Sequence, residues 1–418
     1  MKAGLLFILV WVAITGNLGA QKSCISYTYE QTRLKENTEL AGQLDRIEAF
    51  IKQKLSGDGT VTAARGEETV IRIPVVVHIL YHYPSEKVTD EQVMSQIAAL
   101  NICYRRRNAD TTRTPSYFRP LAADCNIEFQ LATSDPRKRS TSGIIRRYTP
   151  VTEWEADDKM KFSSLMGDDA WDARSYLNIW VCNLNRVAGY ASVPGDAAEK
   201  DGVVIGFPAF GTINAQPGYE MGKTAVHEVG HWLGLRHLWG DQYCGDDGVA
   251  DTPKQAGYNI ECPGVVTITC GNGPYGDMYM NYMDLTNDGC MNLFTLGQKA
   301  RMRALFAPGG ARYSLLTSTG LNPPLIYEIP LPEEDPKWLH PQLFPNPATS
   351  QLTLDLAYDV RWVGKIMHVI NLQGQTVMTV TISSKVQQID ISKLQAGVYF
   401  LATKREDGVS MKLKFLKL

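Results

Sequence analysis

The segment from His227 to His237 holds the side chains best suited to metal chemistry in this 418-residue chain, with the sequence His-Glu-Val-Gly-His-Trp-Leu-Gly-Leu-Arg-His. On a helix, His227 and His231 lie one turn apart and project to the same side, so their imidazoles can bind one zinc ion. Glu228 lies beside them, where its carboxylate can take a proton from a metal-bound water rather than bind the metal. The spacing therefore predicts a hydrolytic zinc site.

His237 is the expected third zinc ligand. On a continuing helix it would lie well off the face of His227 and His231, so the helix must end between them, and Gly234 can adopt the positive φ of such a turn. Three neutral histidines leave a fourth position open, as in catalytic zinc sites. An HExxH string also occurs on ordinary amphipathic helices, but Gly234 and His237 at these offsets, among only seven histidines, favour the metal site.

The elements that must position these residues form an alternating pattern. A helix is expected over residues 219–233, and a second from Thr89, its N-cap, towards residue 105, with Gln92 in the capping-box position. Apolar and β-branched runs predict strands at residues 70–80, 127–132, 177–184 and 202–207. Residues 188–193 are the expected edge at which an extended substrate pairs. Helices and strands in alternation predict an α/β unit whose sheet is backed by helices.

The composition and the first 20 residues indicate the compartment. With 44% hydrophobic residues, 21% charged residues and a net charge of −2, the chain is an ordinary folded protein without an electrostatic case for binding nucleic acid.

Lys2, the apolar residues 5–14 and Ala20 have the order of a secretory signal, and the apolar run is shorter than the roughly 20 residues that span a membrane. We therefore expect a secreted protein with no transmembrane segment, in a compartment where disulfides persist.

The central motif resembles the HExxHxxGxxH sequence of the metzincin metallopeptidases, and Asn281-Tyr282-Met283-Asp284 matches their methionine turn. The resemblance is closer to the pappalysin family, because of the run from Cys244 to Pro253 and the residues 288–295, 298 and 301–302. It covers roughly residues 71–306. It implies an α/β (α+β) metzincin-type catalytic domain with a twisted mixed sheet and an active-site helix.

The resemblance also assigns roles to individual residues. It implies that His227, His231 and His237 bind a catalytic zinc ion and that Glu228 is the general base and later the general acid. Met283 would form the floor of the metal site, although an ordinary core methionine would be buried as well. Leu285 departs from the family, which has at this position a tyrosine that assists the transition state.

The family further implies features of the loop that follows the histidines. Asp247, the Val249 carbonyl and Thr252 resemble its calcium site, since calcium requires hard oxygen ligands; the alternative is a solvated acidic turn. The implied disulfides are Cys244–Cys270 and Cys262–Cys290. Asp288 is the candidate for binding Arg or Lys just after the cleaved bond, a preference that the resemblance also implies.

Cys24 is the remaining residue with a candidate chemical role. In proenzymes of this family a cysteine ahead of the catalytic domain occupies the open zinc position, which indicates a cysteine-switch pro-segment over residues 21–64, including one amphipathic helix over residues 29–51. Cleavage of the Ala64–Arg65 bond would fit the expected specificity. The alternative is a disulfide between Cys24 and one of Cys103, Cys125 and Cys182.

The chain is expected to continue from the catalytic domain, residues 65–320, into a proline-rich linker over residues 321–341. Residues 342–418 alternate in short apolar runs separated by turn residues, which predicts a small β-sandwich. This tail resembles the C-terminal sorting domain of type IX secretion substrates, whose secretion machinery would then be a partner. A carbohydrate-binding or merely stabilising sandwich is the alternative.

Together these features predict a secreted, zinc-dependent endopeptidase that is made as a zymogen and acts on protein or peptide substrates. Two alternative functions, neither of them that of an active peptidase, are also compatible with the sequence. One is a metal-binding pseudo-peptidase with weak or no turnover, for which Leu285 is the sequence support. The other is a surface binding protein whose activity resides in the C-terminal sandwich.

Overall fold

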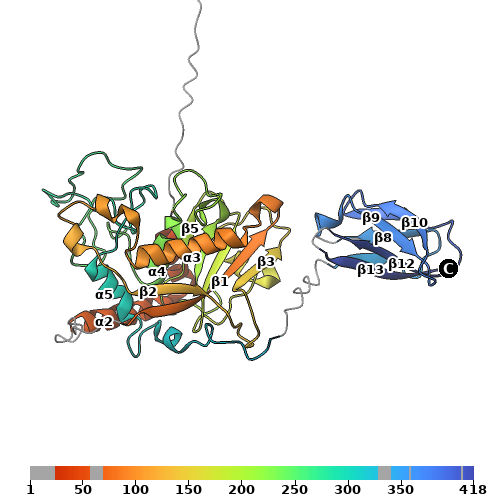
Figure 1. The fold of residues 1–418 in the computed structure, drawn as a ribbon, viewed down its shortest axis with the longest axis horizontal. Coiled ribbons are helices and arrows are strands. Elements are labelled where there is room, and N and C mark those ends of the chain that lie inside the picture. Colours follow the sequence, from red (N-terminus) through yellow and green to blue (C-terminus); the bar gives the residue numbers. More distant parts are fainter. Residues whose placement is uncertain (1–23, 57–68, 328–339, 357–358, 406–407) are drawn as a thin grey trace, which may run out of the picture. The chain divides into compact units, whose positions relative to one another are not determined.

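The computed structural model describes residues 24–56, 69–327, 340–356, 359–405 and 408–418, which divide into two units, Met1–Tyr327 and Glu328–Leu418 (Figure 1). The expected signal of residues 1–20, the Ala64–Arg65 bond and most of the expected linker lie outside the described residues. Among the described residues, no helix is both long enough and apolar enough to cross a bilayer.

The first unit is built on a mixed sheet whose centre is the long strand β1 (Ile71–Tyr81). Its residues are almost all buried, as expected for a β-branched run that is covered on both faces. The sheet order is β2-β1-β4-β6-β5, and β3 also pairs with β1. The other strands are β2 (Ile127–Leu131), β3 (Ile144–Tyr148), β4 (Leu177–Cys182), β5 (Gly189–Ala191) and β6 (Val203–Gly206).

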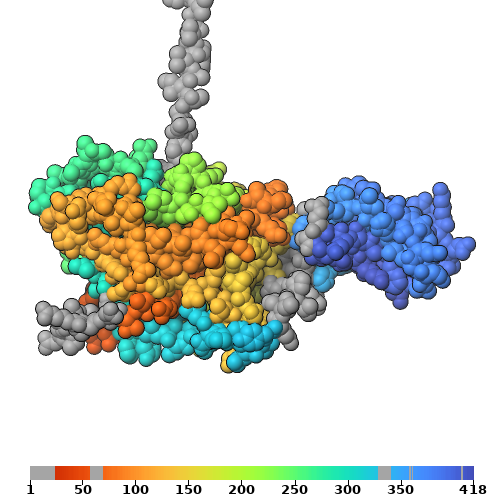
Figure 2. Space-filling model, in the orientation of Figure 1, coloured from red at the N-terminus to blue at the C-terminus, as the bar shows by residue number. Residues whose placement is uncertain are grey.

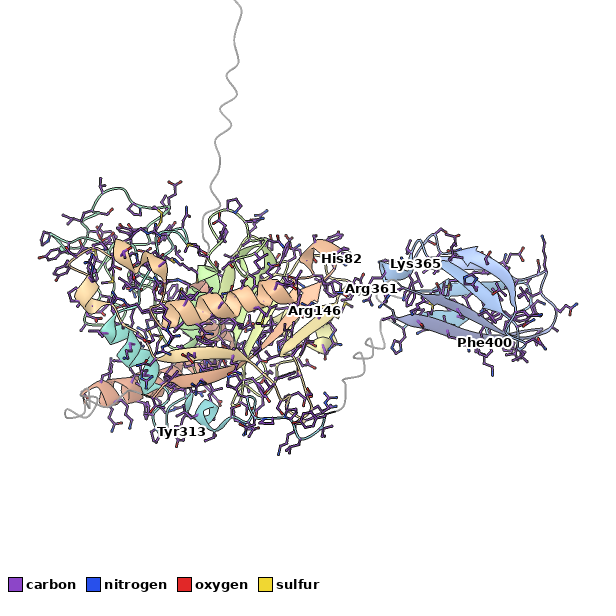
Figure 3. All side chains as sticks on the ribbon, in the orientation of Figure 1. His82, Arg146, Tyr313, Arg361, Lys365 and Phe400 are labelled. Carbon is purple, nitrogen blue, oxygen red and sulfur yellow. A yellow bond between two sulfur atoms is a disulfide. The ribbon has the colours of Figure 1, made fainter. Side chains whose placement is uncertain are left out.

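Strand β5 differs from the rest because it lies at the sheet edge and runs antiparallel to β6, whereas β1, β2, β3, β4 and β6 pair in parallel. The sheet is therefore mixed, and the expected α/β fold is confirmed. Strand β3 was not predicted, since its run Ile-Ile-Arg-Arg-Tyr holds two arginines; Arg146, labelled in Figure 3, donates to the Val88 carbonyl and Arg147 to Asp168.

Three helices accompany this sheet: α3 (Asp90–Tyr104), α4 (Lys223–Trp232) and α5 (Leu296–Ala304). The Thr89 side chain accepts a hydrogen bond from the Gln92 amide, as predicted for an N-cap. The inner side chains of β1, such as Val75 and Val77, share one core with α3 and α4, while Trp180 and Tyr190 pack in a separate cluster. Helix α4 is shorter than predicted at its start, because Gly222 adopts a positive φ of 66° there.

The prediction of one helix over residues 29–51 was wrong. The expected pro-segment contains two helices, α1 (Ser26–Glu36) and α2 (Thr38–Ser56), separated by Asn37 in an extended conformation. Apolar periodicity does not show such a break, because a single extended residue can join two amphipathic helices. Helix α2 lies beside α5 (Figure 1).

The second unit consists of two antiparallel sheets with its own core, so the all-β prediction is confirmed. One sheet has the order β10-β9-β12-β13 and the other β11-β8-β7. Phe400, labelled in Figure 3, lies on β12 with the Lys412 ammonium 4.4 Å from its ring centre. The strands are β7 (Gln342–Phe344), β8 (Gln351–Asp355), β9 (Ile366–Ile370), β10 (Thr376–Thr381), β11 (Val386–Asp390), β12 (Gly397–Lys404) and β13 (Ser410–Lys417).

Candidate metal centre and active site

Helix α4 and the turn after it bring the three predicted histidine ligands together. His227 and His231 project from α4, which ends at Trp232. Gly234 adopts a φ of 80°, the left-handed conformation that the sequence analysis required, and the chain turns back so that His237 faces the other two rings. Among the described residues, Cys24, His227, His231 and His237 form the one group of histidine, cysteine or acidic side chains with metal-binding spacing.

The distances within this group fit one tetrahedral ion. The Nε2 atom of His231 lies 3.0 Å from that of His227 and 3.2 Å from that of His237, and the third pair is 3.3 Å apart. Nitrogens that bind one zinc ion at about 2.0–2.1 Å in tetrahedral geometry lie about 3.3–3.4 Å apart. Burial and the neighbouring His237 hold the pKa of His231 well below its usual range, so that ring is neutral and presents a lone pair. The donor set therefore fits zinc.

Each histidine is oriented through its other ring nitrogen. The Nδ1–H of His227 donates to the Tyr282 carbonyl at 2.7 Å and that of His231 to the Leu235 carbonyl at 3.0 Å. The Nδ1–H of His237 donates to Asp241 Oδ1 at 2.5 Å. Such partners set the tautomer and ring orientation that leave Nε2 free for a metal.

Glu228 lies on the same helix with its carboxylate buried at the mouth of the histidine group. The Ser26 hydroxyl donates to its Oε2 at 2.8 Å. Cys24 Sγ lies 3.5 Å from His231 Nε2 and 3.7 Å from Glu228 Oε2, so the thiol is beside both the predicted ligands and the predicted base. Cys24 and Ser26 thus lie directly against His231 and Glu228.

The same two residues also contact the edge strand β5, the expected substrate edge. Cys24 forms a parallel bridge with Gly189 of β5, and the Ala191 amide donates to the Ser26 hydroxyl at 3.0 Å. The space left beside His231, between α1, α2 and the residues after β5, is a cavity of about 60 Å³. It can hold a few waters but not a peptide.

Met283, the expected floor of the metal site, lies against Gly230 of helix α4. It is fully buried, and a Cβ atom on Gly230 would come within 2.5 Å of its Sδ, so the glycine permits this close approach. Its amide donates to the Asn281 side chain, which also pairs with Gln298 of α5. Leu285 is buried nearby, and Tyr282 packs its ring against Phe294. Neither residue offers a hydroxyl to the metal centre.

Asp288 is completely buried. Its Oδ2 accepts hydrogen bonds from the backbone amides of Met221 and Lys223 at 2.9 and 3.1 Å. The Lys223 ammonium donates to the Asp288 carbonyl at 2.9 Å and to Asp110 Oδ2 at 2.8 Å. The predicted specificity residue is thus part of a buried polar cluster at the start of α4.

The loop after His237 has the predicted oxygen groups close together. The Thr252 hydroxyl lies 2.9 Å from Asp247 Oδ1 and 2.8 Å from the Val249 carbonyl oxygen, at a cavity of about 140 Å³. Burial raises the pKa of Asp247 to about 7. The charge of Arg301 acts in the opposite direction and favours the ionised carboxylate, as a bound cation would.

Two disulfides, Cys244–Cys270 and Cys262–Cys290, link this loop. They interleave in sequence, and the loop lies on the surface of the first unit, in green in Figure 2. None of Cys24, Cys103, Cys125 and Cys182 takes part in a disulfide, so the alternative disulfide of Cys24 is not formed.

Sequence analysis missed two residues of the site. Asp241 could have been found, because a carboxylate four residues after a metal-binding histidine often orients its ring. Ser26 gave no signal, since its role depends on the folded path of the pro-segment. The remaining histidines near the sheet are structural: His78 contacts Asp168 at 2.7 Å, and His82, labelled in Figure 3, contacts the Thr149 carbonyl at 3.0 Å.

Comparisons with known sequences agree with this geometry. Residues 161–307 match the peptidase family described as pregnancy-associated plasma protein-A, and residues 342–417 match the secretion system C-terminal sorting domain. An extracellular metalloprotease of Verticillium alfalfae is 38% identical over 274 residues, 63% of this chain and 84% of that protein. Another, of Pyricularia oryzae, is 42% identical over 131 residues, and this match spans 44% of its length.

Solved structures have the same fold over most of their length. A mutant of Tannerella forsythia promirolysin is 42% identical with a TM-score of 0.63, covering 71% of this chain and 97% of that one. Mature mirolysin of the same organism, in complex with a cleaved peptide, is 48% identical with a TM-score of 0.59, covering 60% and 96%.

Proposed function

This chain belongs to the pappalysin family of metallopeptidases, as a secreted metalloendopeptidase made as a zymogen, and we propose that His227, His231 and His237 hold its catalytic zinc and that Glu228 is its general base and acid. The observation that carries the proposal is the cluster of three Nε2 atoms within 3.3 Å of one another, with Glu228 on the same helix.

The chain's own residues supply orientation and proton transfer. When bound, the zinc ion would polarise the scissile carbonyl and lower the pKa of a water. Glu228 would accept a proton at its carboxylate and deliver it to the nitrogen of the leaving amine. Strand β5 would hold the substrate extended by pairing its backbone with Gly189 and Ala191.

The latent form would depend on two residues of the pro-segment. Cys24 would occupy the fourth zinc position, since a thiolate is a better zinc ligand than water. Ser26 would hold the Glu228 carboxylate and, at the same time, accept from the Ala191 amide that a substrate needs. Its hydroxyl thus supports the block at the base and at the edge strand.

We further propose that Asp247, the Val249 carbonyl and Thr252 bind a structural calcium ion. Their oxygens lie about 3 Å apart at a cavity, and burial disfavours the ionised form of the Asp247 carboxylate, which a bound cation would stabilise. The interleaved disulfides would hold this loop in place when the ion is released.

The substrate preference is proposed to be Arg or Lys just after the cleaved bond, with Asp288 as the acidic residue. Because Asp288 is buried, it would influence the substrate cation indirectly, through the polar cluster at the start of α4, rather than by contacting it. The same preference would direct self-cleavage to Ala64–Arg65. The C-terminal sorting domain would be recognised by type IX secretion machinery, which would leave the enzyme secreted or at the cell surface.

The test compares the wild-type zymogen with Glu228→Ala, both incubated with a mixture of peptides and followed by mass spectrometry. We expect that both bind one zinc ion, that only the wild type loses its pro-segment, and that its cuts precede Arg or Lys. Equal zinc binding with no cleavage by either protein would instead support the pseudo-peptidase alternative. In that case, the hydrophobic Leu285 at the position of the family tyrosine would be the reason.

A further inference from the structure

The pro-segment marks a path along one half of the active-site edge. Cys24 pairs with Gly189, Ser26 binds the Ala191 amide, and Arg33 of α1 reaches Asp196 in the turn that follows β5. The segment therefore follows residues 189–196 in the same direction as the edge strand. Its side chains fill positions that a substrate can take once the pro-segment has left.

The contact at the far end of this path is a buried ion pair. Arg33 Nη2 donates to Asp196 Oδ1 at 3.0 Å, and the exposed fractions of the two side chains are 9% and 0%. The Ala197 amide also donates to Asp196 Oδ1, at 2.8 Å. Among the described residues, no other cationic side chain pairs with Asp196, so loss of Arg33 leaves an uncompensated carboxylate.

Asp158, a second acidic residue under the pro-segment, does not depend on the pro-segment for its cationic partner. Asp158 accepts from the Tyr29 hydroxyl at 2.7 Å, but it also pairs with Lys161 at 2.9 Å and Lys200 at 3.5 Å. Both lysines belong to the catalytic unit and remain when Tyr29 leaves with the pro-segment, so the negative charge of Asp158 stays compensated. Asp196 is therefore the acidic residue on this path that can attract a substrate cation.

The direction of the substrate determines which of its residues meets Asp196. An extended peptide pairs more stably when antiparallel to its neighbour, which is opposite to the direction of the pro-segment. The residues before the scissile bond then extend from Gly189 towards Ala191 and the turn at Val193–Asp196, which is closed by the Asp196 amide and the Val193 carbonyl. A side chain roughly three to five residues before the bond reaches Asp196.

We propose that Asp196 is a specificity-determining residue of the mature enzyme, which binds an Arg or Lys side chain on the amino-terminal side of the cleaved bond. This inference rests on the proposed zymogen mechanism. Arg33 is the internal counterpart of that substrate side chain. The site is separate from the one proposed for the residue after the bond, because Asp288 lies at the start of α4.

The test uses the enzyme after removal of its pro-segment and quenched fluorescent peptides that differ at one position. The third, fourth or fifth residue before the bond is arginine or citrulline, which has nearly the same shape but no charge. We expect kcat/KM to be about tenfold higher for arginine at one position, as for one charge-assisted contact. Asp196→Asn should abolish this ratio by lowering kcat/KM for the arginine peptide, and Asp196→Glu should restore part of it.

A matched control lies in the same loop: Glu199 is exposed, and Glu199→Gln should keep the full ratio. Binding of the same peptides is also measured by fluorescence anisotropy, which requires no turnover. Cleavage without any arginine preference, or a preference that survives Asp196→Asn, overturns the inference alone. Arginine-dependent binding without cleavage supports the role of Asp196 and overturns the proposed peptidase function. If the protein neither cleaves the peptides nor binds them in an arginine-dependent way, the role of Asp196 and the peptidase function are both overturned.

Discussion

At the scale of single residues, the metal centre depends on hydrogen bonds behind the ligands as well as on the ligands. The three Nε2 atoms converge because each Nδ1–H has an acceptor at 2.5 to 3.0 Å. Two of these acceptors are backbone carbonyls, which no substitution removes. The third is the Asp241 carboxylate, so it is the position at which a mutation can test the arrangement.

We expect Asp241→Asn to weaken zinc binding about 10- to 100-fold, because His237 loses the charged acceptor that orients its ring. Competition with a chromogenic chelator measures the affinity. Asp45→Asn, at an exposed position of α2, is the control and should have no effect. Unchanged zinc affinity in Asp241→Asn would show that the turn after Gly234 alone orients His237.

The proposed latency assigns separate contributions to Cys24, beside His231, and to Ser26, which donates to Glu228. In the full-length zymogen, Cys24→Ala should raise basal peptidase activity, and Cys24→Ala with Ser26→Ala should raise it further, by about a factor of ten for one hydrogen bond to a charged group. Initial rates before pro-segment loss, with gel analysis of each sample, measure the effect. If the double variant equals Cys24→Ala, then the contact of Ser26 with Glu228 has no inhibitory role.

At the scale of elements, helix α2 contacts the catalytic unit through Ile51, which lies in the core of that unit, and through an ion pair. Arg301 of α5 donates to both carboxylate oxygens of Glu48, with Nη1 to Oε1 at 3.0 Å, and also to the Gly234 carbonyl at 2.8 Å. The guanidinium thus connects the pro-segment to the turn between His231 and His237. Burial opposes ionisation of Glu48, but the Arg301 charge and hydrogen bonds lower its pKa below the usual value.

This lowered pKa predicts a pH dependence of zymogen stability. A carboxylate whose pKa is lower in the folded state stabilises it above the unfolded-state pKa, about 4.3, and the contribution is lost as the pH falls through the folded-state pKa. In the inactive Glu228→Ala background, Glu48→Gln should lower the free energy of unfolding by about 1 kcal/mol at pH 7. The difference should shrink below about pH 4.3.

Urea unfolding of the two proteins at several pH values measures this difference. Lys52→Gln is the control, because the exposed Lys52 lies 4.0 Å from Glu48 and such pairs contribute little. A difference between wild type and Glu48→Gln that persists unchanged at low pH would contradict an electrostatic attachment of α2.

At the scale of the whole molecule, the two units have separate cores. Helices α3 and α4 pack with the mixed sheet in the first, whereas the second contains a core of its own that includes Leu352, Trp362 and Phe415. The proposed metal centre, pro-segment and calcium loop all belong to the first unit. Peptidase activity and sorting are therefore expected to be separable.

A chain that ends at residue 327 should retain kcat/KM within about twofold and the same Tm for the first unit, because no element of the active site is removed. Peptide cleavage and calorimetry of the truncated and complete proteins measure this. The same truncation should abolish export in a cell with type IX secretion. Loss of peptide cleavage in a folded truncated protein would indicate that the sandwich contributes to the active site.

The sequence by itself determined the chemistry of this protein. The offsets of His227, His231, Gly234 and His237 allow few geometries other than a shared metal, because helix periodicity and a glycine turn are local properties. The strands at the centre of the sheet and the all-β tail were also predictable, since burial on one or both faces leaves a clear apolar pattern. The helix break at Asn37 and strand β3 were not predictable, because neither leaves a recognisable apolar pattern in the sequence.

Only the tertiary structure decided which distant residues meet at the site. Ser26 contacts Glu228 across 202 positions, Glu48 contacts Arg301 across 253, and Arg33 contacts Asp196 across 163. Such pairs depend on the path of the chain between them rather than on local spacing, so no pattern in a single sequence predicts them. The residues proposed to perform the reaction are close in sequence, whereas those proposed to restrain it come together only in the folded molecule.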